Sequence, residues 1–379
     1  MLNRKASADL EISIHDGELA ALEGPWSALG DPAHPGAPFR SFAWISTWWN
    51  SASTSGDAVV LVARDGAEVV GLLPLYPEQT PFGGRRLRLM GDGIVGSDYL
   101  GVIARPERAA ACARAFATHL RALDCDELQL DDLDDHDPLL DAFDGAASEP
   151  RYKCPYIRIG DSFEEYLGAL PDGIGAQFHR RRKWLEKRPG FRIETLATPD
   201  EIERGMDILF DLHHQRWGLE GGSEAIDGPK TEAFHRQAAR KLAEVGWSRV
   251  WVMHVEGAPR AVLYGWRHGD RLAFYQAGHE PAWRPRSVGT VLLGLVIKTC
   301  FDEQIAEFDF LRGEEPYKLR WATGFRQTTR LRVRGAGLRP WLNQEGRALY
   351  WRMRHGAKRA VPGAALEWLR VQRNKWKSA

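Results

Sequence analysis

The sequence predicts an α/β protein that contains a repeated unit followed by a basic helical segment. Its length of 379 residues is enough for two domains. The order hairpin, strand, helix, strand is predicted within residues 58–130 and again within residues 249–311. Charge is distributed unevenly: residues 1–150 hold 24 acidic and 11 basic side chains, and residues 330–379 hold 2 and 13.

Composition and charge exclude several classes of protein. A chain that is 44% hydrophobic and 27% charged is not disordered throughout. Its net charge of zero excludes a uniformly basic nucleic-acid binder. Four widely spaced cysteines without a CxxC motif predict neither a disulfide framework nor a zinc site. The first residues lack an apolar leader, and no run of eighteen apolar residues occurs, so we expect a cytoplasmic protein.

The first copy of the unit follows an aromatic helix. Residues 39–51 place aromatic and aliphatic side chains at helical spacing. Alternating runs at 58–64 and 68–76 flank Asp65-Gly66, which predicts a hairpin because both turn positions tolerate positive φ. The sequence then predicts strands at 87–90 and 99–103, a helix from Pro106 to about residue 123, a strand at 127–130 and a solvated acidic loop at 131–144.

Three predicted helices precede the second copy. The first, at 174–187, is strongly basic, and the third covers 230–245. The second, at 200–217, follows Thr198 and Pro199, which together with Glu201 spell a capping box with proline at the first helical position. The copy itself comprises strands at 249–255, 260–266 and 271–278, a helix at 288–302 and a strand at 307–311, and two basic amphipathic helices are expected at 341–358 and 364–377.

The stretch from 274 to 325 carries the clearest sign of chemistry. It reads FYQAGHEPAWRPRSVGTVLLGLVIKTCFDEQIAEFDFLRGEEPYKLRWATGF, with a loop containing Arg284 and Arg286 between a strand and an apolar helix. Backbone amides at a helix start and the helix dipole favour an anion there. The arginines add positive charge, and Gly289 lets the anion approach the backbone. This order predicts a diphosphate cradle, with a simple capped helix as the alternative.

This stretch resembles the GNAT acyltransferase superfamily, whose Q/R-x-x-G-x-G/A loop after the fourth strand binds the pyrophosphate of acyl-CoA. The matching residues are Arg284, Ser287 and Gly289, with Ser where the first Gly is expected. The phrases AGHEPAW and FDFLRGEEPYKLRWATGF resemble the branch named after the cellulose-biosynthesis CelD/BcsL proteins, which is related to Fem-type tandem GNAT proteins. The likeness is dense over residues 173–334 and weaker but collinear over 39–144.

The resemblance implies tandem GNAT-like domains, each a mixed, mostly antiparallel sheet flanked by helices. The expected division is an N-terminal lobe without a CoA loop at 1–150, an acyltransferase domain at 151–335 and a basic amphipathic helical tail at 336–379. It implies acetyl-CoA or another acyl-CoA as donor substrate, no metal, and direct attack of an amine on the thioester. The implied acceptor is an amino sugar of an exopolysaccharide or its precursor.

The resemblance also implies roles for individual residues. Tyr317 is expected to protonate the leaving thiolate, and His279 to relay a proton. The base is expected among Asp309, Glu314 and Glu315. Residues expected to bind CoA are Gln276, Arg284, Arg286, Ser287, Val288, Gly289 and Thr290, and those expected to bind the acceptor are Arg216, Trp217, Glu315 and Lys318. Aromatic packing of Tyr317, solvent exposure of Asp309 and an ion pair between Lys318 and a glutamate are the structural alternatives.

Two other functions stay open. The first is Fem-type transfer from aminoacyl-tRNA, which is less favoured because the sequence has no heptad segment for a coiled-coil arm. The second is a non-catalytic GNAT scaffold whose Arg- and Trp-rich tail binds a nucleotide signal or an anionic membrane surface. Arg330, Arg332 and Arg334 are spaced as in cyclic-dinucleotide patterns. Packing of the tail on the acidic first lobe is the structural alternative, and peripheral contact with the inner membrane and a cyclic-dinucleotide partner both stay open, whereas DNA is not expected.

Overall fold

The computed structural model describes residues 10–51, 57–80, 84–93, 95–220 and 228–335, without the side chains of residues 216–220. The first elements are β1 (Glu11–Ile14), η1 (Leu19–Leu22), α1 (Glu23–Leu29), α2 (Ala37–Arg40), α3 (Phe42–Ser51), β2 (Val59–Asp65), β3 (Glu68–Gln79), β4 (Arg85–Leu89), β5 (Ile103–Ala104), α4 (Pro106–Ala122), β6 (Glu127–Asp134) and α5 (Leu139–Ala142). We call this part the N-terminal lobe.

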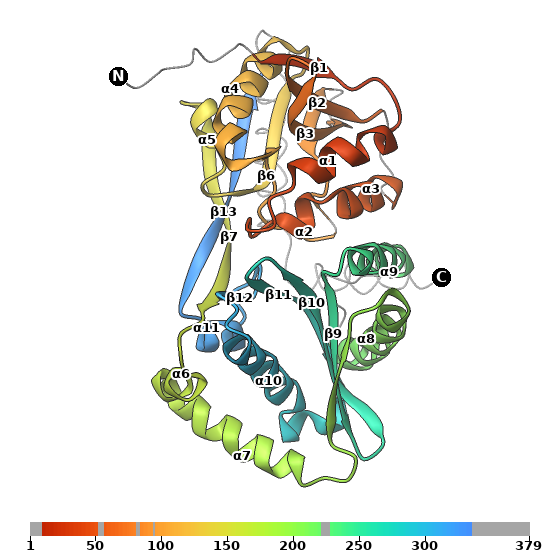
Figure 1. The fold of residues 1–379 in the computed structure, drawn as a ribbon, viewed down its shortest axis with the longest axis vertical. Coiled ribbons are helices and arrows are strands. Elements are labelled where there is room, and N and C mark those ends of the chain that lie inside the picture. Colours follow the sequence, from red (N-terminus) through yellow and green to blue (C-terminus); the bar gives the residue numbers. More distant parts are fainter. Residues whose placement is uncertain (1–9, 52–56, 81–83, 94, 221–227, 336–379) are drawn as a thin grey trace, which may run out of the picture.

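The remaining elements begin with a long strand that leaves the N-terminal lobe. They are β7 (Ala147–Arg158), α6 (Phe163–Ala169), η2 (Pro171–Gly173), α7 (Ile174–Glu186), β8 (Arg192–Leu196), α8 (Pro199–Glu220), α9 (Pro229–Glu244), β9 (Ser248–Val255), β10 (Ala258–His268), β11 (Arg271–His279), η3 (Pro281–Arg286), α10 (Val288–Asp302), β12 (Glu307–Asp309), α11 (Pro316–Trp321) and β13 (Gly324–Arg334). The elements from α6 to α11 form the C-terminal lobe (Figure 1).

The predicted order hairpin, strand, helix, strand is confirmed in both lobes. In the N-terminal lobe the hairpin β2–β3 continues into β4, α4 and β6, and β4 pairs with β6 in parallel. In the C-terminal lobe the hairpin β9–β10 continues into β11, α10 and β12, and β11 pairs with β12 in parallel. Each lobe is therefore a mixed, mostly antiparallel sheet flanked by helices, as the fold class predicted.

Two long strands exchange partners between the lobes. β7 follows β6 in the chain but pairs with β12, and β13 follows β12 but pairs with β6. β7 and β13 also pair with each other, so one sheet runs through the whole molecule in the order β1-β2-β3-β4-β6-β13-β7-β12-β11-β10-β9-β8 (Figure 1). The predicted boundary at residue 150 falls inside β7, and the division into domains stays a prediction.

The C-terminal part of the sheet is covered on both faces. One face packs with α8, α9 and the N-terminal lobe in one apolar cluster, and the other packs against α6, α7 and α10 in a second cluster. α10 (VGTVLLGLVIKTCFD) is apolar around most of its circumference, as a helix enclosed by other elements requires. Its Gly294 allows close contact with Phe178 of α7 and Trp321 of α11, whose rings lie 6.1 Å apart between centroids.

Three sequence expectations differ from the structure. Residues 131–144 are not a solvated loop throughout, because β6 continues to Asp134 and buries Asp131 and Asp132 against arginines of distant strands. Residues 99–103 are not a continuous strand, since Leu100 forms only an isolated bridge with Leu133, the strand β5 is limited to Ile103–Ala104, and Tyr99 has a φ of +56°. The strands β7 and β13 were not predicted, and the arginine pattern from Arg330 to Arg334 lies in β13 rather than in a separate tail.

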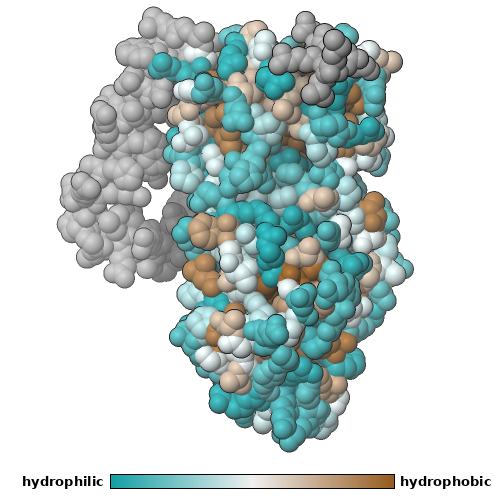
Figure 2. All heavy atoms as spheres, turned by 60° about the vertical axis from the view of Figure 1, so that its left-hand side comes forward, coloured by the Kyte–Doolittle hydropathy of each residue, from teal (hydrophilic) through white to brown (hydrophobic). Residues whose placement is uncertain are grey.

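One face of the molecule is largely hydrophilic (Figure 2). Figure 2 shows small separate groups of hydrophobic residues on a mostly polar face. None of the helices that the structure describes combines the length and apolar character needed to span a bilayer. The predicted helices at 341–358 and 364–377 lie outside the described residues.

Candidate functional site

β11 and β12 separate within the C-terminal lobe. They pair over three positions, the last of which joins Ala273 to Asp309. Just beyond this point β11 carries a bulge, in which Tyr275 has no counterpart on β10. A bulge bends its strand and increases the local twist, so β11 diverges from β12 as it runs toward η3.

A loop of the N-terminal lobe lies against the point of divergence. Arg312, three residues after β12, donates from Nε to Asp98 Oδ1 at 2.7 Å and from its backbone nitrogen to Asp98 Oδ2 at 2.9 Å. The Tyr275 hydroxyl donates to the carbonyl of Val95. Asp98 is completely buried. Both lobes therefore build the region between the two strands.

Asp309 is the buried carboxylate of this region. Only 2% of its surface is exposed, because the N-terminal lobe covers the face of β12 that carries it, which overturns the alternative of solvent exposure. Oδ2 accepts from the Tyr99 hydroxyl at 3.0 Å, and Oδ1 accepts from the Leu311 backbone at 2.7 Å. Burial raises the pKa of Asp309 to about 7, against the opposing charge of Arg326. A carboxyl group with this pKa can both accept and release a proton near neutral pH.

The start of α10 has the geometry of an anion cradle. η3 ends at Arg286, and Ser287 adopts a left-handed conformation with a φ of +58°, which redirects the chain into α10 at Val288. The amides of the first helical turn have no partner within the helix and point toward the loop. Arg284 and Arg286 are both exposed, and the Arg286 guanidinium lies 4.4 Å from the Trp184 ring centroid.

Gly289 and His279 lie side by side at this cradle. A Cβ atom added at Gly289 would meet His279 Nδ1 at 3.7 Å, an ordinary van der Waals contact. The space in front of Gly289 therefore accepts a methyl group. His279 consequently lies nearer to the predicted anion site than to the point where β11 and β12 part.

The sequence of this region matches a known family. Residues 176–319, which include every strand from β8 to β12, match the family described as Acetyltransferase (GNAT) domain. Over these residues the chain is similar to a GNAT acetyltransferase domain. No curated protein matches the chain in sequence.

Solved structures resemble both lobes of the molecule and not only residues 176–319. FemX superposes with a TM-score of 0.59 at 10% identity, covering 89% of this chain and 99% of that one. The C-terminal domain of a putative lysylphosphatidylglycerol synthetase from Agrobacterium fabrum gives 0.55 at 9% identity, covering 83% and 92%. L-PGS from Bacillus licheniformis gives 0.51 at 11%, covering 85% and 97%. At these identities the likeness shows the fold alone, and the cellulose-biosynthesis-like branch stays a prediction.

The other candidate residues of the C-terminal lobe lie on and around α11. Tyr317 is 39% exposed, with its ring 6.5 Å from that of Phe274 on β11. Glu314 accepts a hydrogen bond from Lys153 at 2.9 Å. Lys318 is buried and donates to the Arg312 carbonyl at 2.5 Å.

Some of the side chains expected to bind the acceptor or the acyl-CoA donor form contacts within the protein. Lys318 also lies 3.3 Å from Glu315, so the alternative of an ion pair is the arrangement found. The Gln276 side chain accepts from the backbone of Ala277 at 3.0 Å. Arg216 and Trp217 lie near the end of α8, and their side chains fall outside the described residues.

Sequence reasoning missed several residues of the site. Tyr99, Asp98 and Arg312 build the buried contacts around Asp309, but they come from segments more than 200 residues apart. Tyr275 lies within residues 274–325, but the sequence predicted no functional role for it. Only the position of Arg312 directly after a predicted strand could have drawn attention to it. Among the described residues, no group of three or more His, Cys, Asp or Glu is placed to hold a metal ion.

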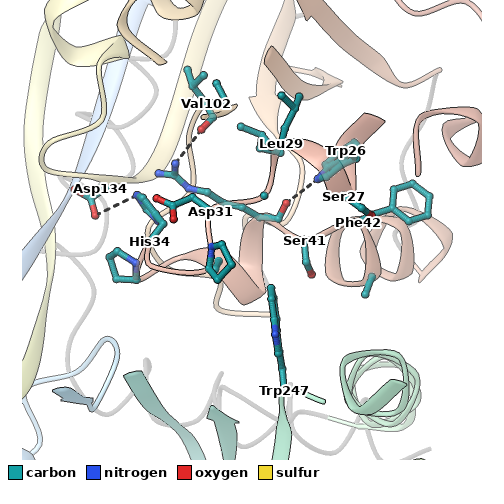
Figure 3. A pocket seen from close by; sticks show the side chains of 18 of the residues that line it. Trp26, Ser27, Leu29, Asp31, His34, Ser41, Phe42, Val102, Asp134 and Trp247 are labelled. Atoms are coloured by element: carbon teal, nitrogen blue, oxygen red, sulfur yellow. Dashed lines mark hydrogen bonds and ion pairs between the residues drawn. The ribbon is translucent and has the colours of Figure 1, made fainter. Parts of the chain in front are cut away.

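A large cavity lies at the junction of the two lobes, and one of its lining residues, Arg326, contacts Asp309. Its volume is about 1450 Å³, and its wall combines α1, α2 and α3 with β7, β13 and the corner before β9 (Figure 3). None of the candidate residues predicted from the sequence lines it.

Proposed function

We propose that this protein is an acyl-CoA-dependent N-acyltransferase that transfers an acyl group to an amine. The observation that carries the proposal is the pairing of β11 and β12, which stops at Asp309 next to a bulge, together with the amide-lined start of α10. An opening between adjacent parallel strands admits an extended thioester, and a helix start favours its diphosphate. The match of residues 176–319 to the GNAT family supports the same reading.

In the proposed reaction the amine nitrogen forms a bond to the thioester carbon, and the carbon–sulfur bond breaks. The amine must lose a proton, and the thiolate must gain one. Asp309 is the favoured base, because its pKa lies near neutrality, whereas Glu314 is exposed and held by Lys153. Tyr317 is the proposed donor of a proton to the thiolate. An amino sugar of an exopolysaccharide or its precursor remains the proposed acceptor.

The start of α10 can be tested with two substitutions at one position. Gly289→Ala adds a methyl group that has room beside His279, so affinity for CoA should stay within about twofold. Gly289→Glu adds a carboxylate at the anion site, and CoA affinity should fall by about tenfold or more. Isothermal titration calorimetry with CoA and acetyl-CoA measures both. If folded Gly289→Glu protein binds CoA as the wild type does, the cradle is misassigned.

Transfer from aminoacyl-tRNA is the second candidate. The feature that favours it is α7, which exposes Arg180 and Lys183 beside the cradle, where Arg286 stacks on Trp184. A polyanion bound there should dissociate as salt rises. Filter binding with aminoacylated tRNA at two salt concentrations, with and without excess CoA, distinguishes the two donors. CoA displaces the tRNA only if both bind at the same site.

A further inference from the structure

The cavity between the lobes has aromatic walls on opposite sides. Trp26 and Phe42 of the N-terminal lobe lie edge to face, 5.7 Å apart between ring centroids. Trp247 of the C-terminal lobe faces them across the cavity (Figure 3). Phe325, on β13, is 61% exposed at the same cavity. A ligand with an apolar or ring-shaped body would contact aromatic surface from both lobes.

The charged side chains of the wall are predominantly acidic. Seven carboxylates and four basic side chains line the cavity. Two of the four basic groups are already neutralised within the protein. Arg40 pairs with Asp137 at 3.1 Å and donates to three backbone carbonyls, and Arg326 pairs with Glu307 outside the cavity wall. The field inside the cavity therefore favours a cation.

The carboxylate of Asp134 lies beside His34, but the imidazole of His34 does not neutralise its charge. The two side chains approach to 3.9 Å between His34 Nε2 and Asp134 Oδ2. Burial, followed by the charge of Arg40, lowers the pKa of His34 well below its ordinary value, so the imidazole is neutral at pH 7. His34 Nδ1 accepts from the Gly36 backbone at 2.9 Å, which leaves the proton on Nε2. Asp31 lies on the same side of the cavity (Figure 3).

We infer that this cavity is a binding site for an organic amine, with the ammonium group beside Asp134 and Asp31 and the body between Trp247 and Phe42 of α3. A carboxylate pair and aromatic faces are the groups that recognise an organic cation. The ligand contacts both lobes, so neither lobe alone forms the site. The inference concerns the cavity and holds whichever donor the GNAT domain uses.

A matched pair of fluorescent probes tests the inference. Dansylcadaverine carries an aromatic body and a primary ammonium, and its N-acetyl derivative keeps the body but loses the charge. Titrations of the full chain, followed by fluorescence anisotropy at pH 7, should give an affinity about tenfold higher for the ammonium form. CoA titrations run in parallel report on the GNAT site separately.

Four variants locate the bound probe. Asp134→Asn should weaken dansylcadaverine binding by about tenfold, whereas Asp161→Asn, the same charge change on an exposed loop outside the cavity, should not. Trp247→Ala should also weaken binding, and Trp283→Ala, a tryptophan beside the cradle, should not. If Asp134→Asn does not fold, the affinity of the Trp247→Ala variant for dansylcadaverine still tests the inference.

Three results would overturn the inference. The first is equal affinity for both probes, which would leave only an apolar site. The second is loss of binding in the Asp161→Asn or Trp283→Ala control to the same extent as in the cavity variants. The third is no binding of dansylcadaverine at millimolar concentration by wild-type protein whose thermal unfolding is cooperative.

Discussion

Asp309 is a carboxyl group that the fold protects from water while leaving it next to a positive charge. Its neighbours Tyr99 and Leu311 both donate hydrogen bonds to it, and Arg326 Nη1 lies 3.5 Å from Oδ2. Burial outweighs these favourable contacts and raises the pKa to about 7. The group is therefore protonated in the folded protein over a pH range in which it is ionised in the unfolded chain.

This difference predicts a pH-dependent stability that Asp309→Asn removes. Between about pH 4 and pH 7 the native state holds a proton that the unfolded chain has released, so the free energy of unfolding falls as pH rises. Relative to Asp309→Asn, the wild type should lose at least about 1.4 kcal/mol across this window, the value of one pKa unit.

Urea unfolding of both proteins at pH 5 and pH 7.5 measures the difference. Asp92, whose pKa burial also raises to about 7, is present in both proteins and cancels. A constant difference between the two proteins at the two pH values would show that Asp309 is ionised throughout.

At the scale of elements, local patterns predicted those helices and hairpins whose partners are near in sequence. α10 begins and ends where its apolar run does, and the hairpins turn at Gly66 and Gly257, both with positive φ. β7 and β13 were not predicted because their partners lie up to 207 residues away in the sequence and their charged residues suggested solvent exposure. Asp131 illustrates this: its arginine partners, Arg88, Arg151 and Arg330, come from three other segments.

The candidate site was predictable to the extent that it depends on one continuous stretch. The cradle before α10 and the strand that carries Asp309 could be located from residues 274–325. The contacts that bury Asp309 could not, since Tyr99 belongs to a segment predicted as a strand of the other lobe. The cavity at the lobe junction likewise depends on how the lobes meet, which no local pattern encodes.

Two glycines of the C-terminal lobe, Gly294 in the contact between α7 and α10 and Gly168 on the exposed surface of α6, should respond oppositely to substitution by alanine. A Cβ at Gly294 would lie 3.0 Å from Trp321 Cη2 and closer still to the ring of Phe178. Gly294→Ala should therefore destabilise the protein by about 1–3 kcal/mol. Gly168, near the end of α6, has no atom within 4 Å of such a Cβ, and Gly168→Ala should stabilise it by about 0.5 kcal/mol.

Thermal and urea unfolding of the two variants beside the wild type provide the measurement. Equal or higher stability of Gly294→Ala would mean that α7 can move away from α10 at little cost.

At the scale of the whole molecule, the exchanged strands link the stabilities of the two lobes. β13 lies between β6 and β7, so the sheet of the N-terminal lobe is completed by the C-terminal part of the chain. Buried ion pairs cross the same junction: Arg312 contacts Asp98 and, at 3.1 Å, Asp132. Breaking one side of such a pair leaves a charge buried without its partner, which is strongly destabilising.

This arrangement predicts that the lobes unfold together. In hydrogen-exchange mass spectrometry at increasing urea, peptides from β2–β4 and from β9–β11 should lose protection at the same urea concentration. A lower midpoint for one lobe, with a correspondingly smaller dependence on urea, would instead support two independent domains with a boundary near residue 150.

The position of β13 also affects how the chain folds during its synthesis on the ribosome. The residues of β6 are synthesised about 200 residues, and those of β7 about 180 residues, before those of β13, which pair with both strands. Until residue 334 has been made, β6 and the facing part of β7 lack the strand that separates them, and their backbone groups are open to wrong pairing. The nascent chain therefore spends most of its synthesis with an incomplete sheet, and cells that make it need to shield that edge until the last strand arrives.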